Sequence, residues 1–430
     1  MSCFDLNIEL YSFCRKFLKP KASAINADSW SMDFRGNVWY QQDQVLSFMK
    51  QCEGCIDSYV EKLLNSPERI IGFSVQSTSK FFSLEVARKI KAKDKDRLIV
   101  FGGPLCFKNC YGIDILKDFT FLDFVCFQEA ERCLPQLLNN IEKHEGVLSH
   151  PGFGYRRKDG TIIDGGDAQP IEDLDEIPFA DYSKFDLAQY TKKSLPISTS
   201  RGCINRCTFC SESTHWRRYR TRSAQNIFSE IKYQLKRYPD IDRFWFNDSL
   251  INGDLKILDE LCDLLISEQI KIKWGGQGMI RREMTKVFLQ KMKQAGCQVI
   301  SYGVENGNSN ILKQMRKAYT PELAEVTLRD TFQAGINVIF NIIVGFPTET
   351  DSEFEQTKDF LKRCHGYASH IELVSLLLLK GSYLYNHLEE FNIAPINYQD
   401  PDWQLNWQTK DRQNTYDIRK RRLEELTLIR

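Results

Sequence analysis

The sequence predicts an α/β protein in which a doubly wound parallel sheet is followed by a partial (β/α)6 TIM barrel. Short apolar runs alternate with helical patterns along most of the 430 residues. Nearly every run is apolar on both faces, as strands of a helix-covered parallel sheet are. An acidic stretch punctuated by proline, residues 171–185, separates the alternations into two groups. The first group fits a doubly wound sheet, and the six alternations of the second fit a partial barrel.

These signals divide the chain into four predicted parts. Residues 1–149 are expected to form the first α/β domain, and residues 150–192 a hairpin and linker with the hairpin turn at Lys158-Asp159-Gly160. The barrel is assigned to residues 193–388 and a C-terminal extension to residues 389–430.

In the first domain, apolar spacing and the breakers Gly and Pro give the order of the elements. Strands are expected at residues 3–6, 69–76, 97–101 and 121–127. Helices are expected up to about residue 19, in one or two pieces between residues 45 and 63, and at residues 82–93 and 130–143.

In the barrel, strands and helices alternate with short connections. Strands are expected at residues 196–200, 243–246, 271–274, 298–304, 337–344 and 371–379. Helices are expected at residues 224–238, 255–267, 283–295, 310–334 in two pieces around Pro321, 352–364 and 383–388.

Three cysteines, Cys203-x3-Cys207-x2-Cys210, lie in a glycine-containing loop after the first barrel strand. Each thiolate can bind one iron of a [4Fe–4S] cluster, which takes four such ligands, so three cysteines leave one iron open for chemistry. The alternative is a buried helical stripe, because this spacing also falls on one helix face. Gly202 and Asn205 are poor helix residues, and the stripe does not continue on either side. The spacing therefore favours a metal site.

Polar residues at the ends of the next barrel strands are candidates for a site around that loop. Chemistry in such barrels gathers at the C-terminal ends of the strands. Asp248 and Gln277 end strands two and three and are expected at the barrel mouth, while Glu305 and Gly345 end strands four and five. Each polar residue can instead be a helix cap or an ordinary loop residue; the candidate caps are Ser249, Asn308 and Thr320.

In the first domain, small residues follow two strands at one edge of the sheet. Ser74 to Ser79 and Gly102-Gly103-Pro104 come at strand ends, where doubly wound sheets bind ligands. A tight turn is the alternative explanation for Gly-Gly-Pro.

Composition excludes several classes of protein. A net charge of +1 and a pI near 7.4 argue against a dedicated nucleic-acid partner. No run reaches the roughly 18 apolar residues of a membrane span, and the N-terminus lacks a signal-peptide layout. We therefore predict a cytoplasmic protein without a membrane span.

Of the fourteen cysteines, the eleven outside the triad are expected to be buried thiols. The alternative is a second metal or redox site made from Cys52-x2-Cys55 and Cys106-x3-Cys110.

Two arginine-rich stretches allow more than one interpretation. The arginines that follow the cysteine loop, interleaved with Trp216 and Tyr219, suit a carboxylate or phosphate or form a solvated basic face; they are Arg217, Arg218, Arg220 and Arg222. The run Arg419-Lys420-Arg421-Arg422 is predicted to be the surface face of a C-terminal helix.

The cysteine motif with Phe209 before its last cysteine resembles the signature of the radical S-adenosylmethionine (SAM) superfamily. The resemblance implies that SAM chelates the open iron of a [4Fe–4S] cluster and that an electron from the cluster cleaves SAM to a 5′-deoxyadenosyl radical. It implies that Phe209 contacts the adenine. Two segments, Tyr302 to Gly307 with Leu312-x2-Met315-x-Lys317 and Ile343 to Thr350, are similar to those of the cobalamin-linked and methylthiotransferase-like branches. This resemblance implies SAM contacts at Glu305 and Gly345, and Asp248 matches an acidic position that faces the barrel mouth.

The N-terminal segments resemble the cobalamin-binding domain fused to many radical SAM enzymes. The matching pieces are Gly72-Phe73-Ser74-Val75, Ile99 to Pro104 and Cys126 to Glu131. The resemblance implies that Ser74, Gly102 and Gly103 lie at a cobalamin edge. Gln128 and Ala130 replace glycines of the family pattern, no Asp-x-His-x-x-Gly motif supplies a cobalt ligand, and the domain is expected to be clipped by one strand–helix unit.

Together these resemblances predict a radical SAM enzyme, similar to class B methyltransferases, that carries out cobalamin-dependent methyl transfer. The expected partners are a small-molecule or peptide substrate and an electron donor such as flavodoxin or ferredoxin. Two alternatives stay open: a radical SAM enzyme without cobalamin that cyclises or rearranges its substrate, and a non-catalytic iron–sulfur electron-transfer or sensor protein. A transfer-RNA methylthiotransferase is disfavoured, because a second cysteine-ligated cluster and an RNA-binding barrel are not evident.

Overall fold

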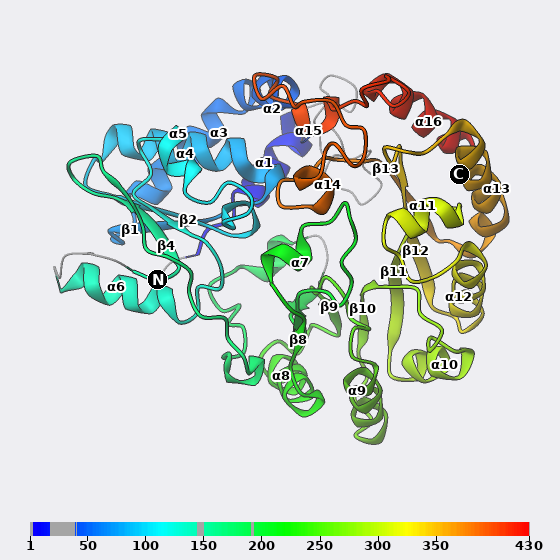
Figure 1. The fold of residues 1–430 in the computed structure, drawn as a ribbon. Helices are drawn as coiled ribbons and strands as arrows, with labels where there is room; N and C mark the ends of the chain where they lie inside the picture. The colour runs from blue at the N-terminus through cyan, green and yellow to red at the C-terminus, as the bar shows by residue number, and fades with distance from the viewer. Residues whose placement is uncertain (1–2, 18–38, 40, 144–149, 191–192, 430) are drawn as a thin grey trace. The chain divides into compact units, whose positions relative to one another are not determined.

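The computed structural model describes residues 3–17, 39, 41–143, 150–190 and 193–429 (Figure 1). The chain divides into two compact units. The N-terminal unit comprises residues 1–172 and 181–189, and the barrel unit comprises residues 173–180 and 190–430. These two units do not coincide with the four predicted parts. The predicted linker, residues 150–192, is shared between them: residues 173–180 belong to the barrel unit, and residues 181–189 belong to the N-terminal unit.

The N-terminal unit contains a five-stranded sheet in the order β1-β2-β3-β4-β5. Its strands are β1 (Ile70–Ser74), β2 (Leu98–Gly102), β3 (Phe124–Cys126), β4 (Phe153–Arg156) and β5 (Ile162–Asp164). The first three are parallel, and β4 and β5 add an antiparallel hairpin to the same sheet. The predicted α/β class with a parallel sheet is thus confirmed, and the predicted hairpin adds two antiparallel strands to that sheet.

Helices cover both faces of this sheet. They are α1 (Leu6–Phe17), α2 (Gln42–Gln51), α3 (Glu53–Leu64), α4 (Lys80–Lys93), α5 (Asp114–Asp118) and α6 (Cys133–Glu142). One core packs Phe101 and Val125 against residues of α1 to α5, and another packs Val100 and Phe124 against α6. Alternate residues of the same strands thus point to opposite cores, as the period of a strand requires.

The strand predicted at residues 3–6 is wrong. Residues 3–5 have no regular structure and α1 begins at Leu6. Leu10 and Cys14 are buried in the core of the unit. Their spacing of four residues is that of a helix face, so the helical period decided the structure of this segment.

The barrel unit contains a six-stranded sheet in the order β13-β12-β11-β10-β9-β6, and every neighbouring pair is parallel. The strands are β6 (Leu195–Ile197), β9 (Arg243–Phe246), β10 (Lys273–Gly278), β11 (Cys297–Glu305), β12 (Asn337–Val344) and β13 (His370–Ser375). Since the strands follow one another in chain order and β6 does not pair with β13, this is the predicted partial (β/α)6 barrel.

The helices that connect the strands lie close to the predicted ranges. They are α8 (Ala224–Arg237), α9 (Leu255–Ser267), α10 (Lys286–Gln294), α11 (Ser309–Gln314), α12 (Pro321–Gln333) and α13 (Asp351–Cys364). Asn308 and Thr320 cap α11 and α12 as expected. Ser249 caps no helix, because the next helix, α9, begins at Leu255 and is capped by Asp254; the Ser249 hydroxyl donates to the carboxylate of Glu212. After β13 come α14 (Tyr383–Asn386), α15 (Trp403–Asn406) and α16 (Tyr416–Ile429).

The two faces of the barrel strands differ in exposure. On β11, Tyr302 is buried and its hydroxyl lies 2.9 Å from that of Thr331 on α12, whereas Ser301 and Gly303 are half-exposed on the opposite face. The helices therefore cover one face, and the half-exposed residues face the barrel interior.

Within the part of the chain that the structure describes, no helix is both long enough and apolar enough to cross a membrane.

Candidate functional site

Cys203, Cys207 and Cys210 lie in a loop without helical structure. The loop follows β6 and runs between the two-residue strand β7 (Ser200–Arg201) and the short helix α7 (Glu212–His215). All three side chains are half-buried free thiols. The interpretation as a buried helical stripe is therefore wrong, and the thiols stand at the C-terminal end of the first barrel strand, as the barrel rule predicts.

The base of this cysteine loop is closed by a small antiparallel pair. β7 pairs with β8 (Arg220–Thr221), which joins Ser200 to Thr221 across the base. Gly202, just after β7, has a φ of +85°, and a Cβ there would lie 2.6 Å from the carbonyl oxygen of Arg218. Only glycine fits both the conformation and the space, so the turn into the motif depends on it.

Asp248, just after β9, holds the start of the cysteine loop by hydrogen bonds. Its carboxylate accepts hydrogen bonds from the backbone N–H groups of Thr199 and Ser200, each at 2.8 Å, and from the Thr199 hydroxyl. Burial raises the pKa of Asp248 to about 6, and these hydrogen bonds act in the opposite direction. The side chain is 5% exposed. It therefore holds the loop, and its predicted contact with a ligand at the barrel mouth stays a prediction.

The other side of the loop is held by segments far along the chain. The N–H of Thr208 donates to the carbonyl of Met315 at 3.2 Å, and its hydroxyl donates to that of Gln314 at 3.1 Å. The N–H of Leu384 donates to the carbonyl of Thr208 at 2.9 Å. Phe209 packs against a core that includes Met315. The loop is thus tied to the segment after α11 and to α14.

Glu305 ends β11 beside the cysteine loop and is paired with Lys317. Lys317 Nζ lies 2.9 Å from Glu305 Oε1, and both side chains are less than 10% exposed. Burial alone lowers the pKa of Lys317, but Glu305 raises it well above its usual range. The φ of Glu305 is +68°, an uncommon conformation for a non-glycine residue that is often found at functional sites. A Cβ on Gly303 would lie 2.4 Å from Glu305 Oε1, so the glycine leaves room for the carboxylate.

Lys317 also connects this pair to the motif. Its Nζ lies 5.4 Å from the centroid of the Phe209 ring, within range of a cation–π interaction. Its positive charge acts to lower the thiol pKa of Cys207, which burial raises. Lys317 belongs to the segment after strand four that resembles the family, but its pairing with Glu305 was not predicted. The spacing of twelve residues across a strand end gave no local signal for it.

The three thiols fit a [4Fe–4S] cluster by their chemistry and their surroundings. Burial raises the pKa of all three, to about 12 for Cys210. Metal binding would therefore release protons here. Among the residues that the structure describes, no three His, Cys, Asp or Glu side chains are close enough to hold a single metal ion. A cluster does not require that closeness, because each thiolate binds a different iron.

Of the other two cysteine pairs, Cys52 and Cys106 are buried in the core of the N-terminal unit, whereas Cys55 and Cys110 are half-buried. Cys52 neighbours Cys14 and Cys55, while Cys106 neighbours Cys110. Burial raises the pKa of Cys52 and Cys106 to about 12. Among the described residues, these cysteines do not come close enough together to hold a single metal ion.

The remaining predicted residues have different surroundings. Gln277 is exposed on β10. Gly345 has a φ of +82°, donates its N–H to Glu349 Oε2 at 3.0 Å and is covered on its α-carbon by Arg419. Phe209, Gln277, Glu305 and Gly345 all come from the cysteine loop or from C-terminal strand ends of the barrel unit. Their predicted ligand contacts stay predictions.

Two predicted arginine surfaces are partly wrong. Arg220 and Arg222 are buried, and Arg222 forms a buried ion pair with Glu230 of α8. Arg419 and Arg422 are buried as well. A buried guanidinium must find partners elsewhere in the fold, which the local sequence does not show.

At the predicted cobalamin edge, Ser74 ends β1 and is exposed, and Gly102 ends β2. Gly103 has a φ of +92°, and a Cβ there would lie 2.8 Å from the backbone nitrogen of Val75. The backbone conformation at the strand ends therefore requires glycine at position 103, whether or not a ligand binds there. Both strand ends lie at the same edge, since Ser74 pairs with Gly102.

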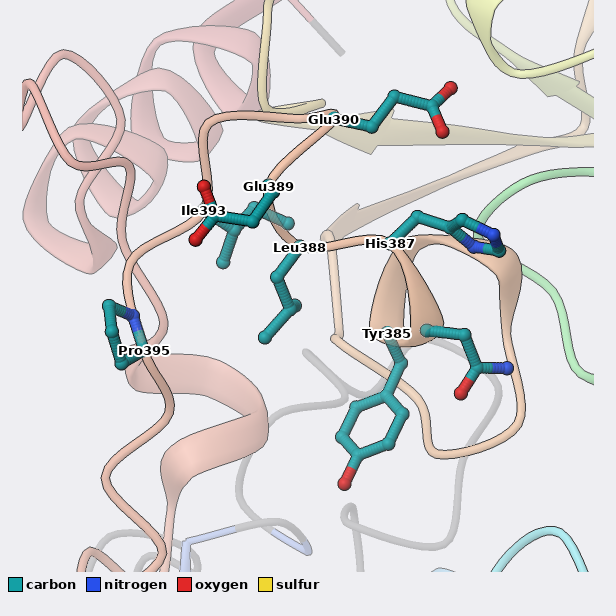
Figure 2. Close-up of a pocket in the computed structure, with 8 residues that line it drawn as sticks. Tyr385, His387, Leu388, Glu389, Glu390, Ile393 and Pro395 are labelled. Carbon is teal, nitrogen blue, oxygen red and sulfur yellow. The ribbon is translucent and has the colours of Figure 1, made fainter.

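A cavity of about 610 Å³ lies in the segment after β13. Its lining comes from residues 385–395, and Figure 2 shows Leu388 near the centre of the lining while Glu390 and His387 point to one side. Glu390 accepts a hydrogen bond from the Tyr383 hydroxyl at 2.9 Å. None of the predicted site residues lines this cavity.

Comparison with known proteins agrees with this geometry. Residues 197–361 match the family model of the radical SAM superfamily. The chain is 25% identical over 305 residues to an uncharacterized methyltransferase of Pyrococcus horikoshii, covering 68% of this chain and 64% of that protein. It is 26% identical over 294 residues to the anaerobic magnesium-protoporphyrin IX monomethyl ester cyclase of Synechocystis sp., covering 67% and 58%. The chain spans less than two thirds of either relative.

Solved structures share the fold. The cobalamin-dependent SAM radical enzyme OxsB, with aqua-cobalamin and SAM bound, matches with a TM-score of 0.68 at 19% identity, covering 87% of this chain and 59% of that one. The radical SAM methyltransferase TsrM from Kitasatospora setae, with cobalamin and a [4Fe–4S] cluster bound, matches with a TM-score of 0.67 at 16% identity, covering 81% and 72%. Residues 197–361 therefore carry a radical SAM domain, and a domain of this kind implies a [4Fe–4S] cluster and SAM as cofactors.

Proposed function

We propose that this protein is a radical SAM enzyme that transfers a methyl group, with cobalamin, to a small-molecule or peptide substrate. The observation that carries the proposal is the cysteine loop: Cys203, Cys207 and Cys210 stand at the C-terminal end of the first strand of a partial barrel, and other segments fasten the loop on two sides. When bound by three thiolates, a [4Fe–4S] cluster supplies the electron that cleaves SAM to a 5′-deoxyadenosyl radical.

The surrounding residues would hold SAM and keep the loop in place. Glu305 offers a buried carboxylate whose charge Lys317 compensates, a suitable acceptor for an ammonium or hydroxyl group. Phe209 offers a half-buried aromatic face for the adenine. Gly345 is buried at the end of β12, where its backbone bonds to Glu349 and Asn414, and would shape that strand end beside SAM; Gln277 offers an exposed carboxamide on β10. Asp248 keeps the loop at the strand ends.

The cobalamin part of the proposal rests on the fold of both units together. The OxsB and TsrM structures that share this fold contain cobalamin. In this chain, Ser74, Gly102 and Gly103 form the edge at which the corrin would bind, and cobalamin there would carry the methyl group. We further propose residues 193–388 as the catalytic barrel, an external donor such as flavodoxin or ferredoxin, and a cytoplasmic location.

Two measurements test this function. Anaerobically reconstituted protein, reduced in the presence of SAM, is expected to release 5′-deoxyadenosine, and a cobalamin titration is expected to change the corrinoid spectrum. Release of 5′-deoxyadenosine without cobalamin binding would overturn the methyl-transfer part and favour an enzyme without cobalamin. A cluster that forms but yields no 5′-deoxyadenosine would overturn the enzyme and favour an electron-transfer or sensor protein.

A further inference from the structure

The C-terminal helix α16 places two buried arginines against the end of β12. Arg419 is 0% and Arg422 is 2% exposed, although their neighbour Arg421 has a side chain that is 60% exposed. The helix lies against α13 and β13 (Figure 1). Long cationic side chains are rarely buried unless paired, so each of these guanidinium groups needs a specific role.

Arg422 is paired with a buried carboxylate. Its Nη1 lies 3.1 Å from Glu349 Oε2 and donates to the Glu349 carbonyl at 3.2 Å, and its Nη2 lies 2.8 Å from Asp351 Oδ1. The side chains of Arg422 and Glu349 are 2% and 1% exposed. A pair this deeply buried interacts strongly, and removal of one partner leaves the other charge uncompensated.

Glu349 in turn connects two strand ends. Its Oε1 accepts a hydrogen bond from Asn306 Nδ2 at 2.7 Å, and its Oε2 accepts one from the N–H of Gly345 at 3.0 Å. Asn306 directly follows Glu305 at the end of β11, and Gly345 directly follows β12. One carboxylate therefore connects the Asn306 side chain, next to Glu305, with the Gly345 backbone at the end of β12.

A second attachment from the C-terminal segment meets the same strand end. Asn414 Nδ2 donates to the carbonyl oxygens of Gly345 and Phe346 at 3.1 and 2.9 Å. Asn414 Oδ1 accepts from Arg419 Nη1 at 2.9 Å. The C-terminal segment thus contacts the end of β12 through several residues. Among these contacts, Arg422 provides the positive charge that compensates Glu349.

We infer that Arg422 is a positioning residue of the SAM site, which acts through Glu349 to hold the ends of β11 and β12 and so keeps Glu305 where it would meet SAM. This inference rests on the proposed function. It assigns the C-terminal extension a part in cofactor binding, because the charge that holds these strand ends comes from α16.

The pairing also predicts a dependence on pH. Burial raises the pKa of Glu349, and Arg422 acts to lower it. The other charged groups near this carboxyl are Asp351 and Glu353 of α13, and Glu353 acts to raise the pKa further. Without Arg422, the carboxyl would take up a proton at a higher pH and lose an acceptor for Asn306 or Gly345.

The test compares Arg422→Met with Arg421→Met, a matched control on the same helix that holds only long ion pairs of 3.8 and 4.0 Å. Both measurements use the oxidised protein. Iron content is determined by iron analysis, and the dissociation constant of SAM by equilibrium dialysis. R422M is expected to load iron normally and to bind SAM about ten-fold more weakly, with R421M within about two-fold of wild type. Arg422→Lys should restore most of the affinity, since it keeps the charge but not the bond to Asp351.

A double-mutant cycle separates positioning from general destabilisation. In a Glu349→Gln background, R422M is expected to change SAM affinity by less than about two-fold, because the carboxylate it serves is absent. The loss in R422M should grow as pH falls from about 8 to about 6, and that in R421M should not. Wild-type protein that binds no SAM would overturn the proposed function. Wild-type protein that binds SAM, with R422M binding equally well or with additive losses in the cycle, would overturn the inference alone.

Discussion

At the scale of single residues, the pair of Lys317 and Glu305 gives the cysteine loop a charged neighbour that is almost excluded from water. Replacing Lys317 by Met leaves a buried carboxylate without its partner, which costs about 3–5 kcal/mol in comparable buried pairs. We expect the free energy of unfolding of the barrel unit to fall by about 3 kcal/mol in urea. Lys313→Met is the control, since Lys313 is exposed. Equal effects of the two variants would contradict the importance of the pair.

Asp248 makes a pH-dependent contribution to stability. Its pKa is raised by burial to about 6, from an ordinary value of 3.8. Between these two pH values, the folded protein keeps a proton that the unfolded chain releases. The contribution of Asp248 to the free energy of unfolding therefore declines as pH rises from about 4 to about 6 and is constant above about pH 6. The decline is at most about 3 kcal/mol.

Asp248→Asn removes this titration while it keeps an oxygen that can accept the hydrogen bonds of Thr199 and Ser200. Thermal unfolding across the pH range measures the difference between wild type and variant. We expect the advantage of wild type over D248N to shrink from about pH 4 to about pH 6. A constant difference over this range would show that the carboxyl does not titrate as its burial requires.

At the scale of elements, the turn at Gly202 decides whether the cysteine loop can form. In Gly202→Ala, a Cβ 2.6 Å from the Arg218 carbonyl would force the loop away from β8. Gly160→Ala is a matched control, because Gly160 has a similar φ of +87° but nothing within 4 Å of the added carbon. We expect G202A to lose most of its iron after reconstitution and G160A to load normally, as measured by iron and sulfide analysis. Normal loading of G202A would contradict the required loop geometry.

The order of the barrel elements was predictable because each is encoded locally. Residues 243–246 and 337–344 were predicted as strands with the bounds that the structure has, since each is a short apolar run between polar turns. The N-terminal segment was misassigned, because four residues are too few to separate a strand from the start of a helix. Leu10 and Cys14 resolve it only through the core that they enter.

At the scale of the whole molecule, two compact units with separate cores should respond to different ligands. A ligand at one hundred times its dissociation constant stabilises the unit that binds it by about 2.7 kcal/mol. In differential scanning calorimetry, we expect SAM to raise the transition of the barrel unit and cobalamin that of the N-terminal unit. Equal shifts of both transitions by both ligands would contradict separate sites.

The sequence by itself determined the α/β class, the six-stranded barrel and the position of the three cysteines in a loop at the first strand end. These follow from periodicity and from spacing within a few residues. Only the tertiary structure decided that Arg422 is buried against Glu349, 73 residues earlier, and that Asp248 holds a loop that begins 49 residues before it. The arginine run resembled a surface face because nothing nearby in the sequence shows its partners. Burial of a charge depends on what the fold brings to it, and no local pattern carries that information.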